Sequence, residues 1–425
     1  MSIATSLPAA FSQRRRFWTR ARGFGVFYGV MALVILVLVA ARVQPDVYSQ
    51  LGIGVIGKPP PVRAALPTQL SLTIIGLILA FNCGYSLLRA PTGKQVNSLL
   101  GISCALLALA AIIAAAAGKS IDLVGMIKDS VRLATPIMLG MLAGVMCERC
   151  GVVNIGIEGM MLSAAAVGYL VSLNTQNMWI GLLAAVLAGG VMAALHAVLC
   201  IRFMVDQIIS GTVINILAVG TSGYIRAAFL LKNPFGAPGV FPYVFKDTPL
   251  WDGIPIVSTI LFQYQPMVYA ALILVPAIWF LLFHTAWGLR SRAVGEHPRA
   301  ADTLGINVFK VRYINVILAG CIAGLGGAWF SLETVGHFDD LMTNSRGFIA
   351  LAAMIFGNWN PIGGALGALL FGFADALNFK FQILEVAVPY QFIGMLPFVL
   401  TMIAVAGVIG RTTPPAADGQ PYQKQ

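Results

Sequence analysis

Apolar runs of spanning length recur from one end of the sequence to the other, and no other feature restricts its fold as strongly. Each run has roughly 20 residues with almost no charge, which is enough for a helix to cross a hydrocarbon layer about 30 Å thick. Inside lipid, only helices and closed barrels satisfy their backbone hydrogen bonds. Barrel strands would alternate polar and apolar residues over about 10 residues, and these runs do not. The sequence therefore predicts an all-α, polytopic membrane protein.

The composition supports this fold class and limits the partners. Of all residues, 58% are hydrophobic and 10% charged, against about 25% charged in ordinary soluble domains. A net charge of +11 would suggest a nucleic-acid partner in a soluble protein, but the basic residues lie mostly in short connections, as in positive-inside topology. The basic cluster between Arg14 and Arg22 precedes the first run, which predicts a cytoplasmic tail and an anchor rather than a removable signal peptide.

About 10 to 12 spans are predicted. They cover residues 23–43, 68–88, 97–117, 131–147, 155–173, 179–201, 207–229, 266–286, 313–332, 346–357, 361–379 and 389–409. Gly357 and Pro361 interrupt one apolar stretch and leave 346–357 too short to span, so we expect a broken or re-entrant helix pair there. With a cytoplasmic N-terminus, both termini lie inside, the loop 287–312 is cytoplasmic and the connection 231–265 is external.

Polar residues at membrane depth are the candidates for a substrate path. Asn154 is expected to cap a helix, and Glu158 follows within its first turn. A carboxylate just inside an apolar span is costly, so Glu158 either complements the helix dipole or faces a polar substrate in a cavity. The other candidates are an amide in the seventh span and an aromatic and amide group at the interrupted stretch: Asn215, Phe356, Asn358, Trp359 and Asn360.

The loop 287–312 contains the pattern of a short surface helix. Pro298 suits the first turn of a helix, and Gly305 is a natural terminator. Two turns of helix are marginal in water, which suggests either a cleft in another protein that receives them or a simple structural connector. The residues assigned to this contact are Glu296, His297, Pro298, Arg299, Ala300, Ala301, Asp302, Leu304 and Gly305.

Motifs for catalysis, metal binding and nucleotide binding are missing from the sequence. Gly118, Lys119 and Ser120 resemble the end of a phosphate-binding loop, but Ile113 stands where the first Gly is required. Cys147 and Cys150 form a lone CxxC with no His at ligand spacing. We therefore predict no enzyme activity, no metal and no cofactor in this chain, and any ATP and Mg²⁺ must be bound by a partner.

Three stretches together resemble the permeases of ABC importers for nucleosides and simple sugars, within the branched-chain amino acid and ribose-type superfamily. They are Glu148 to Met161, Gly295 to Asn307 and Gly357 to Gly364. The resemblance covers the permease core at 126–410, and the N-terminal extension at 23–125, with three spans, departs from the family. The residues themselves predict a basic tail at 1–22 and, from the Pro, Gln and Ala content, a disordered tail at 411–425. The resemblance also implies that Gly295 to Asn307 is the loop that couples the permease to its ATPase.

The resemblance further implies the function and partners of the chain. These are import of a nucleoside, most closely a purine nucleoside, or a simple sugar across the bacterial inner (plasma) membrane, with a double-cassette ABC ATPase, an identical or related second permease and an extracytoplasmic substrate-binding lipoprotein. One alternative is an ion-coupled secondary transporter in which Glu158 and Asp375 relay protons or cations. A polytopic membrane enzyme is the other, although we find no catalytic set for it.

Overall fold

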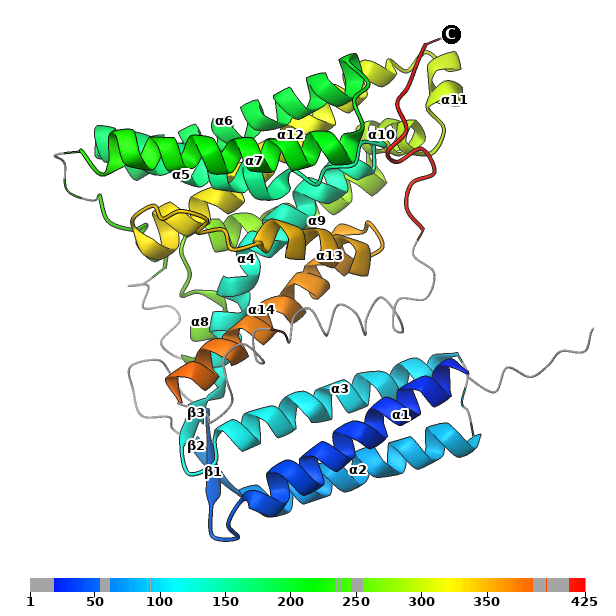
Figure 1. The fold of residues 1–425 in the computed structure, drawn as a ribbon, viewed down its shortest axis with the longest axis vertical. Coiled ribbons are helices and arrows are strands. Elements are labelled where there is room, and N and C mark those ends of the chain that lie inside the picture. Colours follow the sequence, from blue (N-terminus) through cyan, green and yellow to red (C-terminus); the bar gives the residue numbers. More distant parts are fainter. Residues whose placement is uncertain are drawn as a thin grey trace, which may run out of the picture. The chain divides into compact units, whose positions relative to one another are not determined.

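The computed structural model describes residues 19–53, 62–89, 91, 93–233, 236, 238–245, 255–384, 395 and 413–424 (Figure 1). Ten helices within these residues are long and apolar enough to cross a membrane, which confirms the all-α polytopic fold. The predicted span 389–409 lies outside the described residues, apart from residue 395. The chain forms two compact units, divided between Ile121 and Asp122.

Unit 1 is a three-helix bundle with a small sheet at one end (Figure 1). Its helices are α1 (Arg20–Leu33), which continues through η1 (Val34–Val39) and η2 (Ala40–Arg42), α2 (Thr68–Arg89) and α3 (Lys94–Ala115). The strands β1 (Tyr48–Ile53), β2 (Val62–Pro67) and β3 (Ser120–Asp122) pair in the order β2-β1-β3. Hydropathy does not predict this sheet, because its strands are short and lie between spans.

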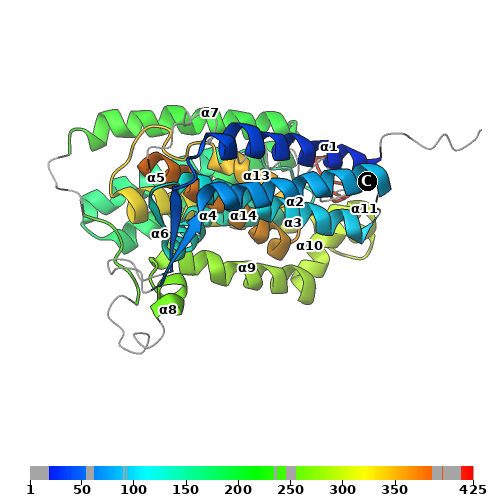
Figure 2. The ribbon, with the colours of Figure 1, turned by 90° about the horizontal axis from the view of Figure 1, so that it is seen from below.

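Unit 2 surrounds the long helix α4 (Leu123–Glu148), most of which is buried. Figure 2 shows α7 and α9 on opposite sides of this bundle, with α4, α5 and α14 between them. The other elements, in chain order, are α5 (Ile157–Thr175), α6 (Met178–Ala197), η3 (Val198–Arg202), α7 (Gln207–Ile225), η4 (Arg226–Leu230), α8 (Pro255–Leu261), α9 (Pro266–His284), α10 (Ala286–Glu296), α11 (Pro298–Thr303), α12 (Val308–Ala328), η6 (Trp329–Val335), α13 (Arg346–Phe356) and α14 (Pro361–Ile383).

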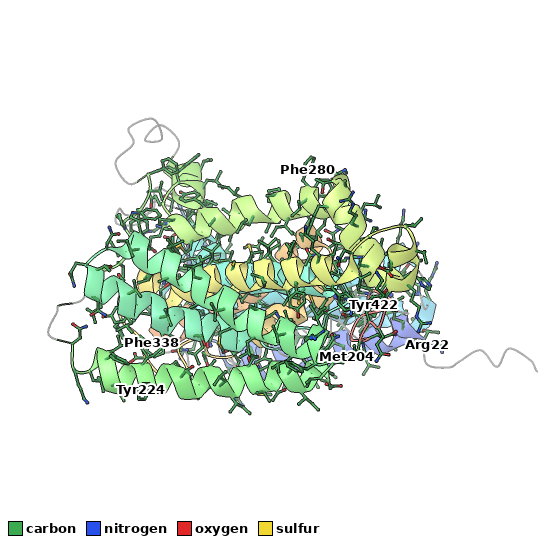
Figure 3. The ribbon with its side chains drawn as sticks, turned by 90° about the horizontal axis from the view of Figure 1, so that it is seen from above. Arg22, Met204, Tyr224, Phe280, Phe338 and Tyr422 are labelled. Carbon is green, nitrogen blue, oxygen red and sulfur yellow. The ribbon has the colours of Figure 1, made fainter. Side chains whose placement is uncertain are left out.

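Small residues let the helices of unit 2 approach closely. A Cβ atom at Gly189 of α6 would clash with the carbonyl oxygen of Gly320 on α12, and one at Gly324 would approach the carbonyl oxygen of Ala185 to 2.6 Å. Backbones this close gain dispersion contacts, which drive helix association in lipid where the hydrophobic effect does not act. Large apolar side chains instead point outward, such as Tyr224 and Phe280, which are 65% and 57% exposed (Figure 3).

The interruption predicted near residue 357 is present. The helix α13 has 11 residues, too few to cross a membrane, and a turn at 357–360 separates it from α14. Asn358 and Trp359 have φ of 52° and 55°, a left-handed conformation that ends the first helix. Asn360 then begins α14, since its side chain accepts a hydrogen bond from the N–H of Ile362 (2.9 Å).

The segment after α4, the turn before α14 and residues 413–424 meet near α10 and α11, and we call this end of unit 2 the α10–α11 end (Figure 1). Arg149, just after α4, donates through Nε to the carbonyl oxygen of Trp359 (2.9 Å). Residues 413–424 contact the end of α10 at the same place, where the N–H of Ala417 donates to the carbonyl oxygen of Gly295 (2.9 Å). These contacts differ from the disorder that the Pro, Gln and Ala composition of 411–425 predicts.

Candidate functional site

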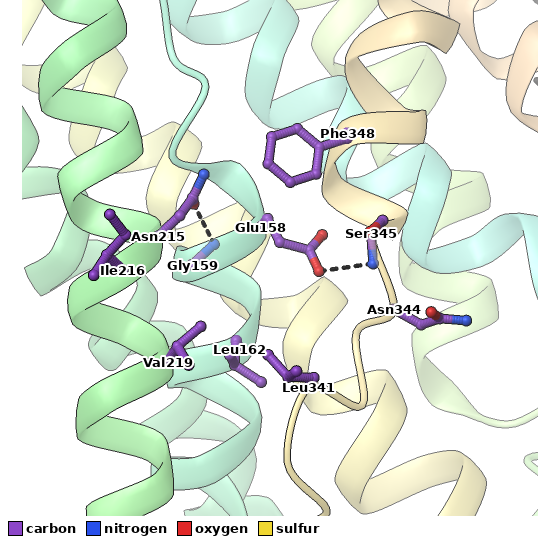
Figure 4. Close-up of a pocket in the computed structure, with 10 residues that line it drawn as sticks. All are labelled: Glu158, Gly159, Leu162, Asn215, Ile216, Val219, Leu341, Asn344, Ser345 and Phe348. Atoms are coloured by element: carbon purple, nitrogen blue, oxygen red, sulfur yellow. Dashed lines mark hydrogen bonds between the residues drawn. The ribbon is translucent and has the colours of Figure 1, made fainter.

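A cavity of about 300 Å³ lies between α5, α7 and the segment leading into α13 (Figure 4). Its wall combines a carboxylate and amide groups with aliphatic and aromatic side chains, the mixture that binds small molecules carrying both rings and hydroxyl groups. The lining residues are Glu158, Gly159, Leu162, Asn215, Ile216, Val219, Leu341, Asn344, Ser345 and Phe348. Glu158 and Asn215, two of the predicted path residues, are among them.

A non-helical segment after α4 brings Glu158 to the cavity. Gly151 has φ of 82°, which turns the chain back into the bundle, and Asn154 is fully buried. The side-chain oxygen of Asn154 accepts a hydrogen bond from the N–H of Gly156 (3.1 Å). The cap of α5 is therefore Gly156 and not Asn154 as expected, because Asn154 stabilises the turn one step earlier. Asn154 does not line the cavity.

The carboxylate of Glu158 caps the N-terminus of a different helix, α13. One oxygen accepts from the Thr343 hydroxyl (2.6 Å) and the N–H of Ser345 (2.9 Å), and the other accepts from the N–H of Gly347 (2.6 Å). The first N–H groups of a helix have no partner within it, and the N-terminus carries a partial positive charge. Glu158 therefore satisfies and neutralises the start of a helix that ends within the bundle.

Asn215 joins α7 to the start of α5. Its side-chain oxygen accepts from the N–H of Gly159 (2.8 Å), and its side-chain nitrogen donates to the carbonyl oxygen of Ile155 (3.1 Å). A Cβ atom at Gly159 would lie 2.8 Å from the Cα of Asn215, so only glycine allows this approach. Both functional groups of the amide are thus engaged with backbone, and Asn215 shapes the wall of the cavity.

The remaining predicted path residues lie at the opposite end of α13, outside the cavity. The side chain of Asn358 contacts Thr413, and the indole N–H of Trp359 donates to the Glu148 carboxylate (2.6 Å). Phe356 faces α14, where a Cβ atom at Gly367 would lie 3.1 Å from its ring. The 11 residues of α13 make a helix roughly 16 Å long, so this group lies about that far from Glu158, which contacts the other end of the helix. The structure therefore separates two sets that sequence analysis grouped together.

Asp375, the second carboxylate of the ion-coupled alternative, is paired. Its carboxylate lies 2.7 Å from Nη1 of Arg346, the first residue of α13, and both side chains are more than four-fifths buried. Arg346 was missed by sequence analysis, as was Thr343, although the polar run before the apolar helix, Thr343 to Arg346, offered a signal. Neither Glu158 nor Asp375 is left with an unsatisfied charge.

The predicted short helix in the loop 287–312 is present as α11, which begins at Pro298 and ends at Thr303. Gly305 has φ of 81° and terminates it as expected. Ala301 is buried and anchors the helix, whereas Leu304 is 81% exposed. An aliphatic side chain held out from a short helix is available to another protein.

The CxxC pair at the α10–α11 end makes packing contacts. The thiol of Cys150 donates to the carbonyl oxygen of Cys147 (3.0 Å), and both side chains are fully buried. Burial raises the pKa of the Cys150 thiol to about 12, which keeps it protonated and unreactive at neutral pH. Within the described part of the chain, no group of three or more His, Cys, Asp or Glu residues is arranged to hold a metal ion.

Comparison with known proteins decides the family. A family model described as the permease component of branched-chain amino acid transport systems matches residues 126–406. The chain belongs to this permease family. The match confirms the resemblance stated above and includes the cavity, α11 and α13.

Individual relatives of the permease are similar over most of their length. This permease is 40% identical over 306 residues to the guanosine ABC transporter permease protein NupQ of Bacillus subtilis, and the alignment covers 68% of this chain and 94% of NupQ. It is 37% identical over 300 residues to the nucleoside ABC transporter permease protein NupC of Lactococcus lactis, with the same two shares. The guanosine ABC transporter permease protein NupP of Bacillus subtilis is 26% identical over 308 residues, 67% of this chain and 83% of NupP. No solved structure matches the permease.

Proposed function

We propose that this permease imports nucleosides across a bacterial inner (plasma) membrane as the membrane subunit of an ATP-driven transporter. The observation that carries the proposal is its 40% identity to a guanosine permease over 94% of that relative. The cavity next to Glu158 supports it, since Phe348 and the aliphatic wall suit a base and the polar groups suit sugar hydroxyls. Both termini, and with them the α10–α11 end, are cytoplasmic in this proposal.

The proposed partners supply what the chain lacks. A double-cassette ABC ATPase binds ATP and Mg²⁺ and receives α11, and an extracytoplasmic lipoprotein delivers the substrate. The second permease is a related chain, because NupQ and NupP of one organism both carry the name of guanosine permease and both are similar to this protein. This chain itself binds no cofactor.

The proposed path runs past Glu158 and Asn215. These residues hold α5, α7 and α13 together around the cavity, so release of the bonds between Glu158 and α13 would open one wall. Asn154 supports this wall from behind, and Phe356, Asn358, Trp359 and Asn360 are proposed to act at the cytoplasmic mouth. Glu296 to Gly305 carry the contact with the ATPase.

An ion-coupled mechanism is less well supported. It would need carboxylates that exchange protons or cations during transport, but Glu158 accepts three hydrogen bonds and Asp375 is paired with Arg346. The relatives named above are all permeases of ABC transporters.

The test is uptake by the complete complex in proteoliposomes. The permease is reconstituted with the proposed ATPase, second permease and binding protein, and entry of radiolabelled guanosine is measured with and without ATP. We expect uptake that requires ATP and is inhibited by other nucleosides but not by glucose or leucine. Uptake by the permease alone in an ion gradient, without ATP, would overturn the proposal.

A further inference from the structure

The tail segment, residues 413–424, is attached to both sides of α11. The N–H of Ala417 donates to the carbonyl oxygen of Gly295 near the end of α10 (2.9 Å). Arg312, in the first turns of α12, donates through Nη1 to the carbonyl oxygen of Gln420 (3.0 Å). The Arg312 side chain is almost fully buried, so the tail carbonyl satisfies part of a guanidinium that is largely shielded from water.

Side-chain packing accompanies these hydrogen bonds. Ala417 and Tyr422 are only 5% and 7% exposed, and the Tyr422 ring lies 5.4 Å from the Phe309 ring of α12. Figure 3 shows Tyr422 at the same end of unit 2 as Met204, which follows η3. A Cβ atom at Gly151 would lie 3.1 Å from the carbonyl oxygen of Ala417. The tail therefore fits closely against the connection between α4 and α5.

The other end of the tail segment holds the turn at the end of α13. The N–H of Thr413 donates to the side-chain oxygen of Asn358 (2.9 Å), and the side-chain nitrogen of Asn358 lies 3.4 Å from the Thr413 hydroxyl. Arg149 fixes the same turn from the side of α4 through the carbonyl oxygens of Asn358 (3.3 Å) and Trp359 (2.9 Å). One continuous segment thus connects the end of α10 with the end of α13.

A groove of about 550 Å³ separates α11 from the tail. The Glu296 carboxylate accepts a hydrogen bond from the N–H of Ala416 at its base (3.1 Å). One wall consists of Glu296, His297, Pro298 and Arg299, and the other of Ala416, Ala417, Gln420, Pro421, Tyr422 and Gln423. A protein that grips α11 therefore also touches the tail.

We propose that the tail segment is a strap that forms part of the ATPase-contacting surface and passes movements of α11 to α13. This inference rests on the proposed function, in which α11 receives the ATPase. The strap pulls on the turn at Asn358, and α13 is one rigid helix whose other end, at Ser345 and Phe348, lines the cavity. A displacement at the cytoplasmic surface thereby reaches the cavity roughly 16 Å away along α13.

Thiol labelling tests whether the strap is attached. Ala416→Cys and Ala417→Cys place a thiol on adjacent residues, the first exposed and the second buried. The full-length variants are treated with a maleimide in inside-out membrane vesicles, and labelling of the unsubstituted protein is subtracted. We expect the thiol at 417 to react at least about tenfold more slowly than the thiol at 416, because it requires the tail to detach. Equal rates would overturn the proposal.

A second experiment tests transmission. Asn358→Gly removes the side-chain contacts with Thr413 but keeps the left-handed φ of 52°, which glycine adopts freely. Gln176→Gly is the matched control, since Gln176 also has a left-handed φ (53°) and side-chain hydrogen bonds to backbone, but lies between α5 and α6. Guanosine uptake and ATP hydrolysis are measured in the reconstituted complex, together with co-purification of the ATPase.

We expect Asn358→Gly to lower the amount of guanosine imported per ATP hydrolysed by about tenfold, with the ATPase still bound, and the control to stay within about twofold of wild type. An unchanged ratio in Asn358→Gly, or an equal fall in the control, would overturn the strap. If the wild-type complex shows no ATP-dependent uptake, the proposed function fails, whereas protection of the thiol at 417 still reports whether the tail is attached.

Discussion

Replacing Glu158 by glutamine changes only the charge and one acceptor at the start of α13. The wild-type carboxylate accepts three hydrogen bonds, from Thr343, Ser345 and Gly347. A glutamine side chain offers one oxygen and places an NH₂ group where the second oxygen stood. Whichever way it is oriented, an NH₂ group faces at least one N–H donor in the bundle.

The expected loss of stability follows from these bonds. A hydrogen bond to a charged group contributes about 1.5–3 kcal/mol, and a donor left without an acceptor costs about 1–3 kcal/mol where it is buried. The bonds from Thr343 and Gly347 are part-buried and the bond from Ser345 is exposed, so the Ser345 donor adds little to this cost. The favourable interaction of a carboxylate with a helix N-terminus adds about 0.3–1 kcal/mol. Because losses that share one site do not add fully, we expect Glu158→Gln to cost about 3 kcal/mol.

The measurement is the apparent Tm of the purified permease in detergent, followed by intrinsic fluorescence. At about 2 °C per kcal/mol for a large domain, Tm should fall by roughly 6 °C. Thr343→Val is the graded control, because it keeps the volume and removes one bond, at about 1 kcal/mol. A Glu158→Gln protein as stable as wild type would refute the capping role, whereas an uptake loss much larger than the loss of folded protein would indicate direct substrate contact.

Three further predictions concern other parts of unit 2. Arg346→Ala should destabilise the permease by about 3 kcal/mol because it leaves the buried Asp375 unpaired, and the double charge exchange should restore much of the Tm. Gly189→Ala should lower the yield of folded protein in membranes, since its Cβ clashes with the backbone of α12 at a cost of about 1–3 kcal/mol or more. Burial raises the pKa of Asp418 to about 6, against the opposing effects of its hydrogen bonds with Glu148 and the N–H of Gly419 and of the charge of Arg312, so the attached tail binds a proton more tightly than the free tail. Attachment is therefore strongest below about pH 4 and weakens as pH rises through about 6. Asp418→Asn should reduce this dependence in the labelling assay, with each rate divided by that of the exposed thiol at the same pH; the Glu148 carboxyl group, which contacts Asp418, remains in the variant.

The span pattern and the helix interruptions were predictable because they depend on local chemistry. Hydropathy over 20 residues locates the spans, and Gly357 with Pro361 marks the break before α14. Pro298 and Gly305 likewise set the limits of α11 within two residues. Each of these signals lies within one turn of the feature that it specifies, so no knowledge of tertiary contacts is needed.

The partner of Glu158 was not predictable, because Thr343 and Gly347 lie 185 and 189 residues further along the chain. The sequence indicates that a carboxylate in a span needs a partner, but packing alone decides which helix supplies it. The contacts of the tail were not predictable for a related reason. Its polar composition is typical of disorder. Three of its hydrogen bonds, however, are made by the backbone groups of Ala416, Ala417 and Gln420, and composition does not reveal backbone contacts.

Polar contacts at both ends and close apolar packing along its side together determine how α13 can move. Its buried residues include Ala350 and Met354, which pack against Gly140 and Gly144 of α4. Such a surface resists tilting but offers few polar bonds against a small displacement along the helix axis. The bonds to Glu158 and Asp375 at one end and to Arg149 and the tail at the other therefore set its position. Loosening the first end, as in Glu158→Gln, should mainly reduce the stability of the permease. Loosening the second end, as in Asn358→Gly, should mainly reduce the amount of substrate imported per ATP. The two variants therefore distinguish a helix cap from a contact that transmits movement.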